Sequence, residues 1–147
     1  MAMINQNPEQ IARDKIDKML EQAGWRVQDK DRINWSAGKG IAIREYQTDS
    51  GPADYVLFID RKPVGIIEAK KEEEGHRLTT AEDQTVRYAT GKLKYLDNDP
   101  LPFVYESTGT ITRFRDYRDP KPRGREIFHF HQPKTMEQWL KKEHSLR

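Results

Sequence analysis

The 147-residue sequence contains no cysteine. Disulfide bonds, zinc–thiolate sites and thiol catalysis are therefore excluded, and the absence fits a reducing compartment. No apolar run approaches the roughly 20 residues that a membrane-spanning helix needs. The first residues, MAMINQNPEQ, have neither the basic nor the apolar region of a secretion signal. We therefore expect a cytoplasmic protein without a membrane partner.

A phosphate-binding loop is also missing. The pattern G-x-x-x-x-G-K-[ST] does not occur, and Gly38-Lys39-Gly40 is too short to form one. The chain is therefore not expected to hydrolyse ATP itself. Charged residues make up 34% of the sequence, but the net charge is only +2. So small an excess does not predict nucleic-acid binding by itself, and the placement of the basic residues matters more.

The hydrophobic pattern predicts a mixed α/β domain over residues 1–147. A first helix is expected to begin after Asn7, the candidate N-cap, with Pro8 at its first position, and to end at Gly24. Strands are predicted at 41–47, 54–60, 63–69, 103–106, 110–116 and 127–131. Two further helices are predicted at about 79–96 and 135–142, with residues 26–40 and 117–125 as loops or linkers.

The two central strands form a predicted hairpin with carboxylates at one end. A turn near Arg61 and Lys62 places Asp54 opposite Glu68 or its immediate neighbour. Facing residues have Cβ atoms roughly 4.5–5.5 Å apart. Lys70 is two residues beyond Glu68 and so points to the same face. Two carboxylates and an ammonium are therefore expected to converge, although charged residues also commonly end strands without any function.

Two close carboxylates repel each other, and one of them has its pKa raised unless a cation is present. Oxygen ligands from Asp54, Glu68 and the Ala69 carbonyl suit Mg²⁺, which keeps several waters and accepts phosphate oxygens. Lys70 beside the ion can orient a water or help to deprotonate it. The pattern thus indicates metal-assisted hydrolysis of a phosphodiester.

The same residues carry a resemblance to a known family. Gly51-Pro-Ala-Asp54 and Glu68-Ala-Lys70 resemble the motif of the PD-(D/E)xK nucleases. The longer stretch IREYQTDSGPADYVLFIDRKPVGIIEAKK resembles the N-terminal endonuclease domain of the R (motor) subunit of type I restriction enzymes. The resemblance begins at ARDKIDKMLEQAGW and continues through QTVRYA, PFVYESTGTITRF and REIFHFHQPKTMEQWL. It implies a restriction-endonuclease-like core, in which helices flank a mixed central β-sheet.

The resemblance also implies roles for single residues. Asp54, Glu68 and Lys70 would be catalytic, and Gln84 and Tyr88 would form the family's Q-x-x-x-Y motif, on one face of a helix. Related enzymes often place another metal-binding carboxylate on the first helix. Glu9 is the candidate here, with Asp17 as the alternative and Glu45 of the first strand as a weaker one.

The implied activity is that of a type I site-specific deoxyribonuclease, cleaving double-stranded DNA with Mg²⁺. The implied partners are methylation and specificity subunits, and ATP would enter only through motor domains that this sequence lacks, so we expect a fragment of a longer chain. Two alternatives stay open from the residues: a stand-alone nuclease of the junction-resolving kind, and a non-catalytic module that binds DNA or docks a subunit.

A basic stripe near the C-terminal third is a second candidate surface for DNA. Arg113 and Arg115 are its first members, and the aromatic Phe114 and Tyr117 interleave with them. Such a stripe is a plausible contact for phosphates rather than bases. The alternative is a solvated loop. His129 and His131 alternate along a predicted strand, but no further ligand stands at a familiar spacing, so we favour a structural role.

Overall fold

The computed structural model describes residues 8–71 and 94–145, with side chains from 10 to 71 and from 94 to 142. Within these ranges the elements are α1 (Pro8–Gln22), β1 (Arg26–Asp29), a 3₁₀ turn (Trp35–Ala37), β2 (Gly40–Thr48), β3 (Gly51–Ile59), β4 (Lys62–Ala69), β5 (Lys94–Leu96), β6 (Asp99–Leu101), β7 (Phe103–Ser107), β8 (Thr112–Asp116), β9 (Arg125–Ile127) and α3 (Pro133–Ser145).

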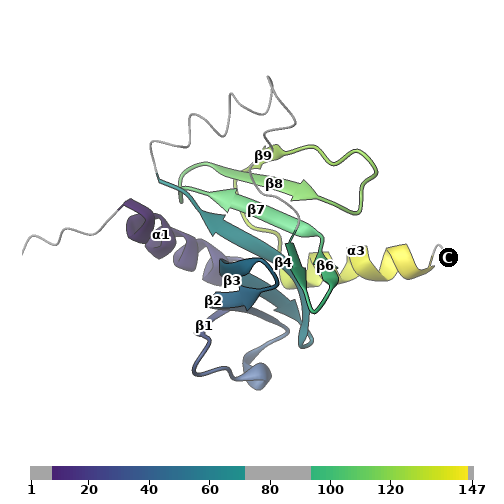
Figure 1. Ribbon diagram of the computed structural model, residues 1–147, viewed down its shortest axis with the longest axis horizontal. Coiled ribbons are helices and arrows are strands. Elements are labelled where there is room, and N and C mark those ends of the chain that lie inside the picture. The colour runs from purple at the N-terminus through teal and green to yellow at the C-terminus, as the bar shows by residue number, and fades with distance from the viewer. Residues whose placement is uncertain (1–7, 72–93, 146–147) are drawn as a thin grey trace, which may run out of the picture.

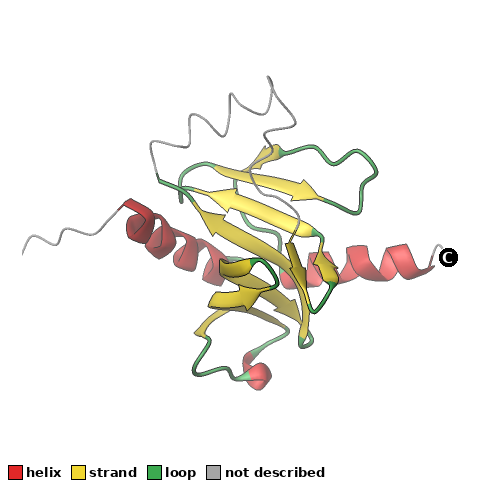
Figure 2. Ribbon diagram, viewed as in Figure 1, coloured by secondary structure: helices red, strands yellow, loops and turns green. Residues whose placement is uncertain are grey.

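One mixed sheet dominates the molecule (Figures 1 and 2). The described strands follow the order β1-β2-β3-β4-β7-β8-β9, and β5 pairs with β6 separately. The β1/β2 and β4/β7 pairs are parallel, and the other pairs of the large sheet are antiparallel. The predicted α/β class, a mixed central sheet with flanking helices, is confirmed.

Both described helices cover the same side of the sheet. Ile16 and Leu20 of α1 and Met136 of α3 are fully buried in one cluster with Tyr55 and Phe103 of the sheet. Figure 1 shows α1 and α3 following one another across that side. The apolar residues of the first helix, which recur at spacings near 3.6, therefore form its core-facing stripe, except that Ile11 is 43% exposed.

The opposite side of the sheet has a second core without a described helix. Val56, Phe58 and Ile66 lie there with Leu101, and Trp35 of the 3₁₀ turn packs against them. Trp35 and Tyr46 both meet the Phe58 ring edge-on, with centroids 5.0 and 5.2 Å away. Among the described residues, short strands and the aromatic 3₁₀ turn cover this side.

The central hairpin is regular at its turn and then shifts register. Asp60 and Arg61 both adopt positive φ, 50° and 69°, which is the geometry of a tight two-residue hairpin turn. The turn thus lies one residue before the predicted centre at Arg61 and Lys62. Phe58 pairs with Pro63, but Leu57 pairs with Gly65, so Val64 is the extra residue of a β-bulge.

Several predicted boundaries are wrong, and three of them change the kind of element. Residues 26–29, predicted as loop, form β1, an edge strand in which only Val27 is apolar and therefore gives no alternating pattern. Lys94–Leu96, predicted as the end of a helix, is instead a strand that turns at Asp97 and Asn98, both with positive φ. The last strand is Arg125–Ile127 and not 127–131, since Phe130 and His131 have left the sheet to pack in the core.

Candidate active site

The predicted carboxylate pair lies where β3 and β4 separate. The last pair between these strands is Tyr55 with Ile67, so Asp54 and Glu68 are the next residues of each strand. The Ala69 N–H donates to Asp54 Oδ2 at 2.8 Å. The Asp54 side chain accepts this hydrogen bond in place of a backbone carbonyl of β3. The bond holds the Asp54 carboxylate beside β4.

The bulge decides which side of the sheet carries Glu68. Facing residues of an antiparallel pair share a face, and a shift of one residue reverses the face of every side chain that follows. Without the extra Val64, Asp54 would face Ile67, and Glu68 would point to the opposite side. Gly65 permits this geometry, because a Cβ on it would meet the Phe103 carbonyl oxygen at 2.3 Å.

Glu68 titrates abnormally because it is largely removed from solvent beside another acid. Burial raises its pKa to about 7, with further increases from the negative charge of Asp54 and from a hydrogen bond to it; Lys94 and Lys70 oppose the shift. A hydrogen bond therefore joins the two carboxyl groups, and the raised pKa favours a proton on this pair. A close pair of acids that retains a proton is the expected state of a site short of positive charge.

Lys70 leaves β4 toward the neighbouring strand. Its N–H donates to the Ser107 carbonyl at 2.8 Å, and its Nζ lies 3.8 Å from Glu106 Oε2. Glu106 is 6% exposed and pairs with Glu68 across the parallel β4/β7 register. Glu106 was missed from the sequence, although it ends an apolar strand as Glu68 does.

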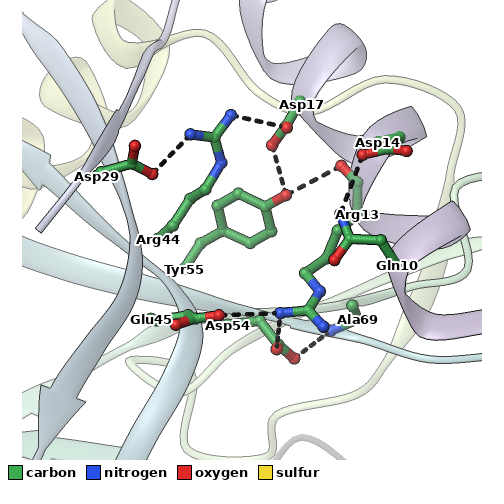
Figure 3. Close-up of polar contacts among 10 residues, drawn as sticks. All are labelled: Gln10, Arg13, Asp14, Asp17, Asp29, Arg44, Glu45, Asp54, Tyr55 and Ala69. Atoms are coloured by element: carbon green, nitrogen blue, oxygen red, sulfur yellow. Dashed lines mark hydrogen bonds and ion pairs between the residues drawn. The ribbon is translucent and has the colours of Figure 1, made fainter. Parts of the chain in front are cut away.

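An arginine of α1 reaches the same end of the hairpin (Figure 3). Arg13 Nη1 lies 3.3 Å from Glu45 Oε1 and 3.9 Å from Asp54 Oδ1. Glu45 adopts a positive φ of 53° within β2 and is exposed. No sequence pattern marks Arg13, because its place depends on how α1 lies across the sheet. The site thus has a guanidinium on one flank and the Lys70 ammonium on the other.

The first-helix carboxylates have different outcomes. Asp17 is occupied by structural partners: its Oδ2 accepts from Arg44 Nη2 at 2.8 Å, and its Oδ1 accepts from the Tyr55 hydroxyl at 2.5 Å (Figure 3). This leaves Asp17 poorly suited to bind an ion. Glu9 lies on α1, but its side chain is outside the described part of the structure.

Gln84 and Tyr88 lie outside the described residues altogether. The basic stripe is described, and much of it is engaged in the protein. Arg113 donates to the Gly124 carbonyl at 2.7 Å. Arg115 is 6% exposed, with its guanidinium 5.9 Å from the centroid of the Tyr117 ring. Both therefore have intramolecular contacts, and Arg115 in particular is not presented to a DNA backbone.

The described histidines are split between core and surface. His131 Nδ1 lies 2.7 Å from the Tyr105 hydroxyl, and burial followed by the charge of Arg125 lowers its pKa to about 4. Its carbonyl accepts from Trp25 Nε1 at 2.8 Å. His129 is exposed. The alternating pair is therefore not brought together as two ligands.

The oxygen ligands at the hairpin end suit a hard cation that binds only a few protein groups. Among the described residues, no group of three or more His, Cys, Asp or Glu side chains is arranged around a common metal position. Asp54, Glu68 and backbone carbonyls are the oxygens nearest the hairpin end, and burial together with the charge of Asp54 raises the pKa of Glu68 there. Mg²⁺ is commonly held by one or two carboxylates with waters and phosphate oxygens completing its shell.

The mixed sheet with its strand order and flanking helices defines a restriction-endonuclease-like fold. A solved fragment assigned to an HsdR subunit of a type I restriction enzyme from Vibrio vulnificus YJ016 has a similar fold, with a TM-score of 0.57 and 18% identity. That match covers 92% of this chain and 25% of the other. Neither α1 nor α3, the helices of the described ranges, has the length and apolar character needed to cross a membrane.

Residues 26–102 match the family described as the second domain of the type I restriction enzyme EcoKI endonuclease subunit, and the chain belongs to this family. It is also 24% identical, over 187 aligned positions, to the EcoKI endonuclease subunit of Escherichia coli (strain K12). That alignment covers 90% of this chain and 16% of the relative's length.

Proposed function

We propose that this chain is a Mg²⁺-dependent endonuclease domain that cleaves phosphodiester bonds of double-stranded DNA, with Asp54, Glu68 and Lys70 as its catalytic residues. The observation that carries the proposal is the contact between Asp54 and Glu68 at the end of a hairpin, with Lys70 following on the same strand. Membership in a type I restriction endonuclease family supports a nuclease.

The electrostatics of the pair favour a divalent cation as its partner. Bringing two carboxylates together costs free energy that a cation removes, and the raised pKa of Glu68 records that cost. Asp54 and Glu68 are the side chains that would hold Mg²⁺, with the Ala69 carbonyl as a backbone ligand. When bound, Mg²⁺ would supply Lewis-acid stabilisation of phosphate charge and a more acidic water.

The chain's own groups then have separate tasks. The Ala69 N–H holds Asp54 Oδ2, which leaves Oδ1 as the outward oxygen of that carboxylate. Lys70 orients a water at the phosphate or accepts its proton, which is the role of a general acid–base group. Arg13 lies close enough to the carboxylates to contact a phosphate oxygen and so to neutralise charge that develops on it.

The wider assembly is part of the same proposal. Gln84 and Tyr88 would contact DNA near the site, and cleavage by this domain would have no sequence preference of its own. Sequence choice would come from partner specificity and methylation subunits in a cytoplasmic type I restriction complex, and ATP would act through motor domains outside this sequence. These proposals rest on the similarity to the family. This chain spans 16% of the length of the EcoKI endonuclease subunit.

Nicking of supercoiled plasmid tests the proposal. Purified wild-type chain, Asp54→Ala and Asp99→Ala are compared with Mg²⁺, Mn²⁺ or EDTA, and Asp99 is an exposed acid of β6 that serves as the control. The same variants are tested in the complete natural polypeptide with its partner subunits. Metal-dependent cleavage lost only in Asp54→Ala supports the proposal. Equal cleavage by wild type and Asp54→Ala would show that another site, or a contaminant, does the chemistry.

Calorimetric titration with Mn²⁺ separates the competing functions. Saturable binding by the wild type that Asp54→Ala abolishes is expected of a metal-dependent nuclease. A non-catalytic module would bind DNA equally well in both proteins and show no such loss of the metal.

A further inference from the structure

A buried glutamate lies beside the proposed site without a role in it. Glu106 is 6% exposed at the end of β7, in register with Glu68 of β4. Its cross-strand neighbour on the other side is Arg113 of β8. Acidic side chains are rarely this buried unless a cation compensates them. The strand order therefore places Glu106 between the carboxylate pair and an arginine.

Lys70 is tied to β7 at two points. Its backbone N–H donates to the Ser107 carbonyl at 2.8 Å, and its Nζ lies 3.8 Å from Glu106 Oε2. The Lys70 side chain is 29% exposed and the Glu106 side chain 7%. The buried partner is therefore the fixed one, and the long, flexible lysine side chain is the one whose freedom it limits.

We propose that Glu106 is a positioning residue for Lys70, which holds the ammonium at the edge of the carboxylate pair. This inference rests on the proposed nuclease function. A lysine side chain has four rotatable bonds, and a single fixed anion within ion-pair distance restricts them at little cost in solvation. Catalytic groups need such support, because small displacements of a reacting group lower rates sharply.

The alternative for Glu106 is direct participation as a third metal ligand. Glu106 forms an ion pair with Lys70, and the described residues include no group of three or more acidic or histidine side chains placed to hold one metal ion. Glu106 is also the most buried of the acids at this end of the sheet, since Asp54 is 27% exposed and Glu68 is intermediate. We therefore assign Glu106 to Lys70 and not to the ion.

A double-mutant cycle tests the assignment in the cleavage-competent protein. Glu106→Gln should lower kcat about 10- to 100-fold, the usual effect of removing a supporting contact. KM for plasmid and the Mn²⁺ dissociation constant should change less than about 2-fold, because a residue that acts through Lys70 would contact neither the DNA nor the ion. In a Lys70→Ala background, Glu106→Gln should lower kcat less than about 3-fold further, since residues that act as a unit are not additive.

Two matched variants control the cycle. Glu126→Gln changes an exposed acid that faces Arg113 from its other side, and it should leave kcat unchanged within about 2-fold. Glu106→Asp keeps the charge with a shorter reach and should recover part of the loss. If Glu106→Gln melts below the assay temperature, the cycle is run with Glu106→Asp at a lower temperature.

The possible failures are distinguishable. Full activity of Asp54→Ala would sink the proposed function itself. Loss of activity in Asp54→Ala with full activity in Glu106→Gln would overturn only the positioning role. Additive effects of Glu106→Gln and Lys70→Ala, or a Mn²⁺ affinity lowered tenfold or more in Glu106→Gln, would also overturn it, because they would show that Glu106 acts independently of Lys70.

Discussion

Two polar clusters lie one residue apart along β3, and their charges are arranged differently. Tyr55 belongs to the first cluster, where its hydroxyl donates to Asp17 and Arg44 joins Asp17 to Asp29 at 2.8 and 2.9 Å (Figure 3). Asp54 belongs to the second, where it contacts Glu68. Consecutive residues of a strand point to opposite faces, so the first cluster lies on the side of the sheet that α1 covers and the second on the other side.

In the first cluster the carboxylates are paired with cations and hydrogen-bond donors, and in the second the two carboxyl groups face each other. Asp17 receives a hydroxyl and a guanidinium, and the pKa of Arg44 is raised, chiefly by its hydrogen bond to Asp17. Glu68 instead retains a proton up to about pH 7, because burial and Asp54 both oppose its ionisation. A cluster with matched charges stabilises the fold, whereas one with excess acid offers a position to a cation. The comparison thus separates a structural network from a candidate catalytic one.

Removing Lys70 should give the largest effect and leave the fold intact. Lys70→Ala should lower the rate of DNA cleavage about 10²- to 10⁴-fold, the usual contribution of a general acid–base or orienting group. Lys70→Arg should also fail, because a guanidinium is bulkier and stays protonated. Single-turnover cleavage assays and thermal melts on the same preparations provide the measurement.

Lys71→Ala is the internal control for this prediction. Lys71 follows β4 and lies next to Lys70, so a general loss of positive charge would affect both variants equally. Equal damage from Lys71→Ala and Lys70→Ala would show that the site needs charge and not a particular ammonium. The cluster of Asp54 and Glu68 would then no longer be assigned a catalytic lysine.

Disrupting the first cluster, that of Asp17, Arg44 and Tyr55, should lower stability and leave cleavage intact. Asp17→Ala leaves Arg44 with Asp29 and the Tyr55 hydroxyl with the Arg13 carbonyl. Loss of a partner for part-buried polar groups costs about 1–3 kcal/mol, so the free energy of unfolding should fall by this amount. Urea denaturation measures it. Cleavage per folded molecule should stay near that of wild type, and a loss like that of Lys70→Ala would instead make Asp17 part of the site.

The sequence allowed the central features of the fold to be predicted because their patterns are strong. The first helix has a clear start and an apolar stripe, and Ile16 and Leu20 are buried as that spacing requires, whereas the last helix begins at Pro133, two residues before its predicted start. The hairpin was found from two apolar runs. β1 is short and mostly polar, and β5 has only three residues, which also fit the end of a predicted helix, so the sequence does not reveal either strand.

The contact of Asp54 with Glu68 was predicted with a turn one residue out of place. The bulge at Val64 offsets that error, because it moves the pairing by one residue before the strands reach the site. Glycine in a strand is a known sign of a bulge, and Gly65 was that sign. Arg13 and Glu106 could not be found, because their proximity to the site depends on how α1 crosses the sheet and on which strand lies beside β4.

Varying pH should sharpen the comparison through Glu68. Its pKa is about 7 in the folded chain and the ordinary value is 4.5, so the folded state binds the extra proton between these values. Without metal, the contribution of Glu68 to the free energy of unfolding should therefore be largest below about pH 4.5. It should fall by about 1–2 kcal/mol as pH rises through 7. Glu68→Gln should remove this component, as seen in melts from pH 5 to 8.

Metal should act in the opposite direction to the proton. A cation that binds the folded state stabilises it, and it must displace the proton of Glu68. Mn²⁺ should therefore raise the melting temperature more at pH 8 than at pH 5.5, and EDTA should reverse the shift. Asp17→Ala should keep this response. A shift that is equal at both pH values would argue that the ion binds elsewhere.

The smallest expected effect comes from the hydroxyl of Tyr55, and it measures how far the two clusters are independent. The hydroxyl donates to Asp17 and lies 3.0 Å from the Arg13 carbonyl, while burial and Asp17 raise the pKa of Tyr55. Tyr55→Phe removes one hydrogen bond but keeps the buried ring, so it should cost about 0.5–1.5 kcal/mol of stability. Because Asp54 directly precedes Tyr55 on the same strand, a larger effect would appear as reduced Mn²⁺ affinity. Urea denaturation and Mn²⁺ titration of one preparation measure both.

Unchanged Mn²⁺ affinity would show that the backbone between Tyr55 and Asp54 transmits little from the first cluster to the acidic pair. A tenfold loss would show that the first cluster positions Asp54.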